Sequence, residues 1–419
     1  MSDPIVGDAS DRLHSRWGRR HPFMYAAALP VSVSYYFLWN PPELSENGLF
    51  FYLLTVAIFV RTMITFYEVP STALAPELSA DYDERTKLSA VRHFFGWAGG
   101  IGIAVATYLV LLVPTEQYPT GQLNPQGYQT YGVIGSLLMF IAIIVSTAGT
   151  HRHIPSLKVA PPKQKRSLGK ALAEARETLW NRPFMALFGY GFFAAMGGGL
   201  ASAMHIYLTT YFWELSAEQI GVLVPSSFVS ALIALVAAPI IAARIGKKPA
   251  AIGLSLAAAV MGPVPILLRF AGAMPANGSN ELLMWLIGFN IIEVTLIIAS
   301  TTLVSAMMAD VVEQAELTTG RRSEGIFFAA RSFIGKSLAG MGIIMGTFIL
   351  SAVDFPATAQ PGEVDAAIIE HLGMVYAPTV VAIYFASLAC LLFYNISREQ
   401  HAENVHTLER LRAERAAAV

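Results

Sequence analysis

A carboxylate inside an apolar segment is the first candidate for chemistry in this chain. Glu68 stands in the run Thr65-Phe66-Tyr67-Glu68-Val69-Pro70, within a stretch that otherwise has the composition of a lipid-embedded helix. A charged side chain at that depth costs about 2.5–3.5 kcal/mol on insertion scales, and it usually marks an ion or substrate pathway. The alternative is an ion pair with an arginine that only holds helices together. Thr65 lies one helical turn before Glu68, so both can present oxygen atoms on one helix face.

Two basic side chains in apolar segments are candidates for holding a solute. Arg92 offers a planar fork that binds hydroxyls or a carboxylate through two hydrogen bonds, whereas Lys336 is a compact point charge. Either side chain could instead extend to the inner membrane surface. Glu293 and Arg61 are further intramembrane charges, which could pair with one another; Arg61 could also pair with Glu68 along its own helix.

The composition is that of a polytopic membrane protein. Of 419 residues, 54% are hydrophobic and 14% charged, and the mean hydropathy is +0.52. A soluble domain usually carries about 25% charged residues. The single cysteine, Cys390, cannot form a disulfide within one chain. Apolar runs of about 20 residues, long enough to cross a bilayer, predict membrane-spanning helices near 22–41, 48–76, 88–113, 130–150, 183–212, 219–243, 249–271, 283–308, 326–353 and 371–396.

The distribution of Lys and Arg predicts the orientation of these helices. Placing residues 2–21 in the cytoplasm puts most of the 28 basic residues in inside loops. Cytoplasmic loops of membrane proteins carry such an excess. We therefore expect both termini to be cytoplasmic, in the cell (inner) membrane. The loops on the opposite side contain no Lys or Arg: 42–47, 114–129, 213–218, 272–282 and 354–370.

The chain is expected to have two related halves. Arg92-His93-Phe94-Phe95-Gly96 is echoed by Arg331-Ser332-Phe333-Ile334-Gly335, and each motif follows an acidic inside loop. Duplicated halves with a site between them are typical of secondary transporters. The second half has six expected spans but the first only four, so we expect the first helix and part of the second to be missing before Met1. The predicted divisions are an N-terminal bundle at 1–150, a cytoplasmic linker at 151–182, a six-helix C-terminal bundle at 183–396 and a cytoplasmic tail at 397–419.

Three motifs resemble the glycoside–pentoside–hexuronide:cation symporters, the melibiose-carrier-like branch of the major facilitator superfamily. Asp3 to Arg20 is similar to their second helix and the following loop, Tyr67 to Arg92 to their fourth and fifth helices, and Ala309 to Lys336 to their tenth and eleventh. The resemblance implies an all-α membrane protein of two pseudo-symmetric helix bundles, the N-terminal one incomplete.

The resemblance also implies a function. We expect cation-coupled symport of a small polar solute, a sugar, glycoside or sugar acid, by alternating access. The alternatives are transport of a lysolipid or other amphipathic solute, and a truncated protein that does not transport.

Roles for individual residues come from the same resemblance. It assigns cation coupling, by Na⁺ or H⁺, to Asp3, Thr65 and Glu68. It assigns solute binding to Glu68, Thr72, Arg92 and Lys336. Thr72 replaces a tryptophan of the melibiose carrier, so the usual aromatic platform for a sugar is absent there. A cytoplasmic gate of ion pairs is expected from Asp11, Arg12, Arg85, Asp310, Glu313, Glu316 and Arg321.

Other chemistry has no motif in the sequence. No nucleotide-binding loop, Cys/His cluster or nucleophile–base arrangement is evident. We expect no enzyme activity, no cofactor beyond the coupling ion, no nucleic-acid partner and a monomer in the bilayer. Glycines at 99, 100, 102 and 197–199 are expected to let helices pack closely.

Overall fold

The chain folds into helices joined by short turns. The computed structural model describes residues 2–74, 78, 82–156, 181–319, 324–356, 358–397, 399–400, 403–404, 406–407 and 410, and these contain no β-strand. They form two compact units, Met1–Lys165 and Arg166–Val419, which are described separately. The division falls within the segment predicted to link two bundles.

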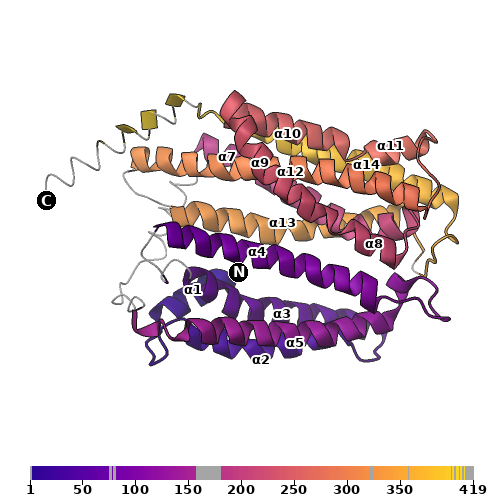
Figure 1. Ribbon diagram of the computed structural model, residues 1–419, viewed down its shortest axis with the longest axis horizontal. Helices are drawn as coiled ribbons and strands as arrows, with labels where there is room; N and C mark the ends of the chain where they lie inside the picture. Colours follow the sequence, from indigo (N-terminus) through magenta and orange to yellow (C-terminus); the bar gives the residue numbers. More distant parts are fainter. Residues whose placement is uncertain are drawn as a thin grey trace. The chain divides into compact units, whose positions relative to one another are not determined.

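The N-terminal unit is built around the pairing of α2 with α5 and α3. Its core consists of small and branched side chains, Ala27, Ala28 and Val31 of α2 and Ile143 of α5. Small residues allow helix axes to approach closely inside a membrane. The elements, drawn in indigo to magenta in Figure 1, are α1 (Ser2–Arg12), α2 (His21–Trp39), α3 (Glu46–Leu74), α4 (Tyr82–Ala106, followed by a π-helical turn at Thr107–Leu111) and α5 (Pro125–His151).

The C-terminal unit has two interrupted helices among longer ones. Breaks at Val224-Pro225 and Gly262-Pro263 divide two of its segments, as expected where proline removes a backbone donor. Its largest buried cluster includes Phe184, Leu187 and Met307. The elements are α7 (Arg182–Tyr207, followed by a π-helical turn at Leu208–Phe212), α8 (Ala217–Leu223), α9 (Ser226–Ile245), α10 (Lys247–Met261), α11 (Val264–Phe270), α12 (Asn280–Thr319), α13 (Glu324–Ala352) and α14 (Ala366–Leu392).

The predicted membrane spans coincide with helices of the structure. Within the described residues, 8 helical segments are long and apolar enough to cross a bilayer. The predicted span at 326–353 is helix α13, whose apolar portion, Leu338–Ala352, is shorter than these. The predicted span at 22–41 is helix α2 of 19 residues, which is not among the 8. Large apolar side chains such as Leu235 and Phe348 are exposed on the helix surfaces, as is expected of side chains that face lipid.

One of the expected glycine contacts is confirmed in the C-terminal unit. A Cβ atom added to Gly199 of α7 would lie 2.0 Å from the Ala339 carbonyl oxygen of α13. On the opposite side of the same contact, a Cβ on Gly342 would lie 2.0 Å from the Met196 carbonyl oxygen. Only glycine allows the two backbones to come this close. A Cβ atom added at glycine 99, 100 or 102 would meet no atom of another element within 4 Å. The packing role of these glycines stays a prediction.

Candidate functional site

One face of α3 carries the polar residues of the candidate site. Arg61, Thr65, Glu68 and Thr72 follow one another at intervals of four, three and four residues, so they form a stripe along the helix. Thr65 is buried, Glu68 is partly buried, and Arg61 and Thr72 are exposed. Pro70 lies within the helix just after Glu68, and because it has no N–H it cannot form the helical hydrogen bond of that turn. The polar residues of the stripe therefore flank a helical turn that lacks one backbone hydrogen bond.

Helix α1 brings a second carboxylate to this stripe. The Thr65 hydroxyl donates a hydrogen bond of 3.1 Å to Oδ1 of Asp3; the alternative acceptor for the same proton is the Arg61 carbonyl, also at 3.1 Å. Helix α1 packs directly on α3 here, since a Cβ atom at Gly7 would lie 3.6 Å from the Val69 side chain, an ordinary contact distance. Asp3 and Thr65, two of the three residues expected to couple a cation, are thus in direct contact. Glu68 follows one turn along the same face.

Helix α4 brings a guanidinium to the other end of the stripe. Nη2 of Arg92 donates a hydrogen bond of 2.5 Å to the Thr72 hydroxyl. That hydroxyl in turn donates to the Glu68 carbonyl oxygen at 2.6 Å. The Arg92 side chain therefore lies against α3, one helical turn after Glu68, and its solute-binding role stays a prediction. The structure thus gathers Asp3, Thr65, Glu68, Thr72 and Arg92 on one face, while the Lys336 side chain lies outside the described residues.

Aromatic side chains link the helices of the N-terminal unit. Tyr67 of α3 donates a hydrogen bond of 2.9 Å to the Ser146 hydroxyl of α5. A separate aromatic cluster joins α2 to α5, in which Trp39 stacks on Tyr128 with ring centroids 5.8 Å apart. The Tyr35 hydroxyl donates to that of Tyr131 at 2.7 Å. Aromatic residues at 35 and 39 and at 128 and 131 share helix faces, a signal that the sequence analysis did not use.

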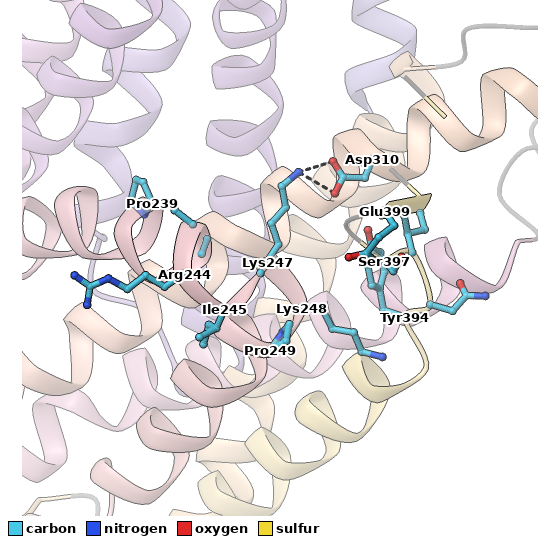
Figure 2. A pocket seen from close by; sticks show the side chains of 15 residues that line it. Pro239, Arg244, Ile245, Lys247, Lys248, Pro249, Asp310, Tyr394, Ser397 and Glu399 are labelled. Atoms are coloured by element: carbon cyan, nitrogen blue, oxygen red, sulfur yellow. Dashed lines mark hydrogen bonds and ion pairs between the residues drawn. The ribbon is translucent and has the colours of Figure 1, made fainter. Parts of the chain in front are cut away.

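The expected gate residue Asp310 has a partner from a different loop. Lys247, at the start of α10, donates to both carboxylate oxygens of buried Asp310, at 2.6 and 2.9 Å, as Figure 2 shows. Figure 2 also shows Arg244 pointing away from this pair. Arg321, another residue of the expected gate, lies outside the described residues, and Lys247 was not among the residues expected there.

A cavity of about 760 Å³ surrounds this ion pair. Its wall includes Arg244, Lys248 and Tyr394 (Figure 2). Burial, together with the neighbouring Asp310 carboxylate, raises the pKa of Tyr394, so its hydroxyl stays protonated. Glu313 and Glu316 follow Asp310 on α12 and are partly buried. The side chains of Asp11, Arg12 and Arg85 lie outside the part of the chain that the structure describes, and their gate role stays a prediction.

The described residues contain no group of three or more His, Cys, Asp or Glu side chains that could hold a metal ion. The oxygen atoms that the structure brings together around Thr65 include its own hydroxyl, the Asp3 carboxylate and the Arg61 carbonyl. Glu68 adds a second carboxylate from the next turn of α3.

These features define a polytopic helical membrane protein whose intramembrane polar residues face one another across neighbouring helices. The chain belongs to the family of MFS/sugar transport proteins, whose pattern matches residues 1–398. The resemblance drawn from the three motifs is confirmed, and the protein is an integral membrane transporter of this family.

Similarity to individual transporters supports this assignment. An uncharacterized symporter of Synechocystis is 26% identical over an alignment that covers 96% of this chain and 86% of the relative. The isoprimeverose transporter of Lactiplantibacillus pentosus is 24% identical, covering 94% of this chain and 78% of the relative. The sodium-dependent lysophosphatidylcholine symporter 1 of Gallus gallus is 23% identical, covering 99% of this chain and 80% of the relative.

Proposed function

We propose that this protein is a cation-coupled symporter of a sugar or glycoside, with both termini on the cytoplasmic side. The observation that carries the proposal is the polar stripe of α3, in which Glu68 lies between the Asp3–Thr65 contact and the Thr72–Arg92 contact. Relatives named as a symporter and as an isoprimeverose transporter support the same class of activity.

In this proposal one end of the stripe binds the cation and the other end binds the solute. The Asp3 carboxylate and Thr65 hydroxyl, with Glu68, receive Na⁺ or H⁺. The guanidinium of Arg92 holds hydroxyl groups of the solute, since its fork can donate two parallel hydrogen bonds. Neutralising Glu68 removes its electrostatic attraction for Arg92, so cation binding changes the freedom of Arg92 to bind the solute. That link between two neighbouring groups on one helix is a physical basis for coupling.

The test is uptake by proteoliposomes that contain the purified protein. Radiolabelled isoprimeverose and lactose are offered under an imposed sodium gradient and, separately, under an imposed proton gradient. We expect accumulation above the outside concentration with one of the two gradients, and its loss when an ionophore collapses that gradient. Accumulation that is equal with and without a gradient would contradict cation coupling.

An amphipathic solute is the second candidate. It is supported by the relative named as a lysophosphatidylcholine symporter. Thr72 also favours it, because this residue stands where the melibiose carrier has a tryptophan. The same proteoliposomes offered a fluorescent lysophosphatidylcholine distinguish the two. Gradient-driven uptake of the lysolipid without uptake of either sugar would assign the second class.

A further inference from the structure

A small cavity in the C-terminal unit surrounds a carboxylate that the proposed site does not use. The cavity has a volume of about 160 Å³, and its polar lining is formed by His205 and Thr209 of the α7 segment, Asn290 and Glu293 of α12, and Tyr376 of α14. All of its lining residues belong to the C-terminal unit. Glu293 is an intramembrane charge for which the family motifs offered no role.

The cavity lies where helices are interrupted. The α7 segment changes to a π-helical turn at Leu208–Phe212, and Gly262 and Pro263 separate α10, which ends at Met261, from α11. Interrupted helices are a common feature of ion and substrate sites in transporters. The Glu293 carboxylate reaches this break, since a Cβ atom at Gly262 would lie 2.8 Å from Oε1 of Glu293.

The Glu293 carboxylate has no hydrogen bond or ion pair within the described part of the chain. None of the described residues that line the cavity is Lys or Arg. The titratable groups that face it are His205 from α7 and Tyr376 and Tyr384 from α14. An ionised carboxylate that is largely removed from water and has no partner is unfavourable. Because no cation among the described residues neutralises Glu293, a cation from solution is the candidate for that role.

We propose that Glu293 is a proton-binding residue and that His205 passes the proton between it and water. A hydronium ion from the solution protonates the His205 imidazole and becomes water. The imidazolium passes this proton through water in the shared cavity to the Glu293 carboxylate, which leaves a neutral imidazole and a neutral carboxylic acid. This centre is additional to the carboxylates of the N-terminal unit.

The lining of the cavity favours a proton over other ligands. Cavities that hold small organic molecules usually measure about 300–1,000 Å³, so this one is too small for a sugar. Two of the polar side chains of the lining are held in place by hydrogen bonds within the C-terminal unit. The Asn290 amide donates to Ser226 at 2.6 Å, and the Thr209 hydroxyl donates to the His205 carbonyl at 2.8 Å. Histidine is a proton carrier at physiological pH but a poor ligand for sodium.

Infrared difference spectroscopy on the purified protein in lipid nanodiscs tests the assignment without any solute. We expect a carbonyl-stretch band of a protonated carboxylic acid at neutral pH, absent in Glu293→Gln and shifted but retained in Glu293→Asp. Glu281→Gln is the matched control, because Glu281 is an exposed carboxylate in the first turn of the same helix; it should leave the band unchanged. After a pH jump, His205→Asn should slow the appearance of the band by about 100-fold, the lower range for a positioned proton-transfer group.

The outcomes separate this proposal from the proposed transport function. A band that survives in Glu293→Gln would show that another group binds the proton. Disappearance of the wild-type band on addition of NaCl would show that sodium, and not a proton, neutralises Glu293. Unchanged kinetics in His205→Asn would remove the relay. Because no solute or gradient is present, failure of sugar uptake leaves the spectroscopic result unaffected.

Discussion

Replacing Lys247 with methionine should destabilise the C-terminal unit by about 2 kcal/mol. Removing one partner of a fully buried ion pair costs about 3–5 kcal/mol, whereas an exposed pair contributes about 0–1 kcal/mol. The pair of Lys247 with Asp310 is intermediate, since the Asp310 side chain is 7% exposed and that of Lys247 is 37% exposed. Methionine retains most of the apolar stem, so the loss is chiefly that of the charge and its two hydrogen bonds.

The chain provides its own reporter for this measurement. Its single cysteine, Cys390, is partly buried in α14 and packs against Gly189 of α7. A thiol-reactive dye that fluoresces on attachment will therefore report opening of the C-terminal unit during heating in detergent. A loss of about 2 kcal/mol corresponds to a fall of roughly 4–8 °C in the unfolding temperature of a unit of this size.

A neighbouring lysine provides the control. Lys248 donates one hydrogen bond of 3.1 Å to the Leu392 carbonyl oxygen, so Lys248→Met should cost about 1 kcal/mol or less. Adding Asp310→Asn to Lys247→Met should recover part of the loss, because the unpaired buried charge is removed. Equal unfolding temperatures for Lys247→Met and Lys248→Met would refute the reasoning.

Three further substitutions test the helix packing and the polar stripe. Gly342→Ala should destabilise the C-terminal unit by about 1–3 kcal/mol or more and so lower the same unfolding temperature, because its Cβ would lie 2.5 Å from the Leu200 nitrogen as well as 2.0 Å from a carbonyl oxygen. The control is Gly340→Ala, whose Cβ would meet no atom within 4 Å and which should change the unfolding temperature little. Equal effects of the two substitutions would contradict the close packing. Glu68→Gln should abolish accumulation of solute against a gradient in proteoliposomes while membrane yield stays normal, and undiminished uphill uptake would exclude Glu68 from coupling. Arg92→Lys should raise the half-saturation concentration for uptake by about tenfold, which corresponds to a loss of roughly 1.4 kcal/mol of binding free energy. The reason is that a point charge cannot replace a planar fork. Unchanged uptake kinetics would show that the solute binds elsewhere.

Spacing and composition were enough to predict the helices and the face that Thr65 and Glu68 share on α3. Apolar runs of about 20 residues predict membrane-spanning segments because the bilayer itself sets the required length. The intervals between Thr65, Glu68 and Thr72 place them on one face in any α-helix, since 3.6 residues complete a turn. The family was also recognisable from the three motifs. These properties depend on local geometry or on the surrounding solvent, so the order of residues determines them.

The partners of the charged residues were decided only by the tertiary structure. Asp310 is paired with Lys247, 63 positions away, a lysine that the expected gate did not include. Glu293 was recognisable as an intramembrane charge, but its cavity is completed by side chains of α7, α8, α11 and α14. Such neighbours are fixed by how helices stack and where they are interrupted. The sequence of a single helix contains no information about which residue of another helix will lie opposite it, and the energy of a buried charge depends on that neighbour.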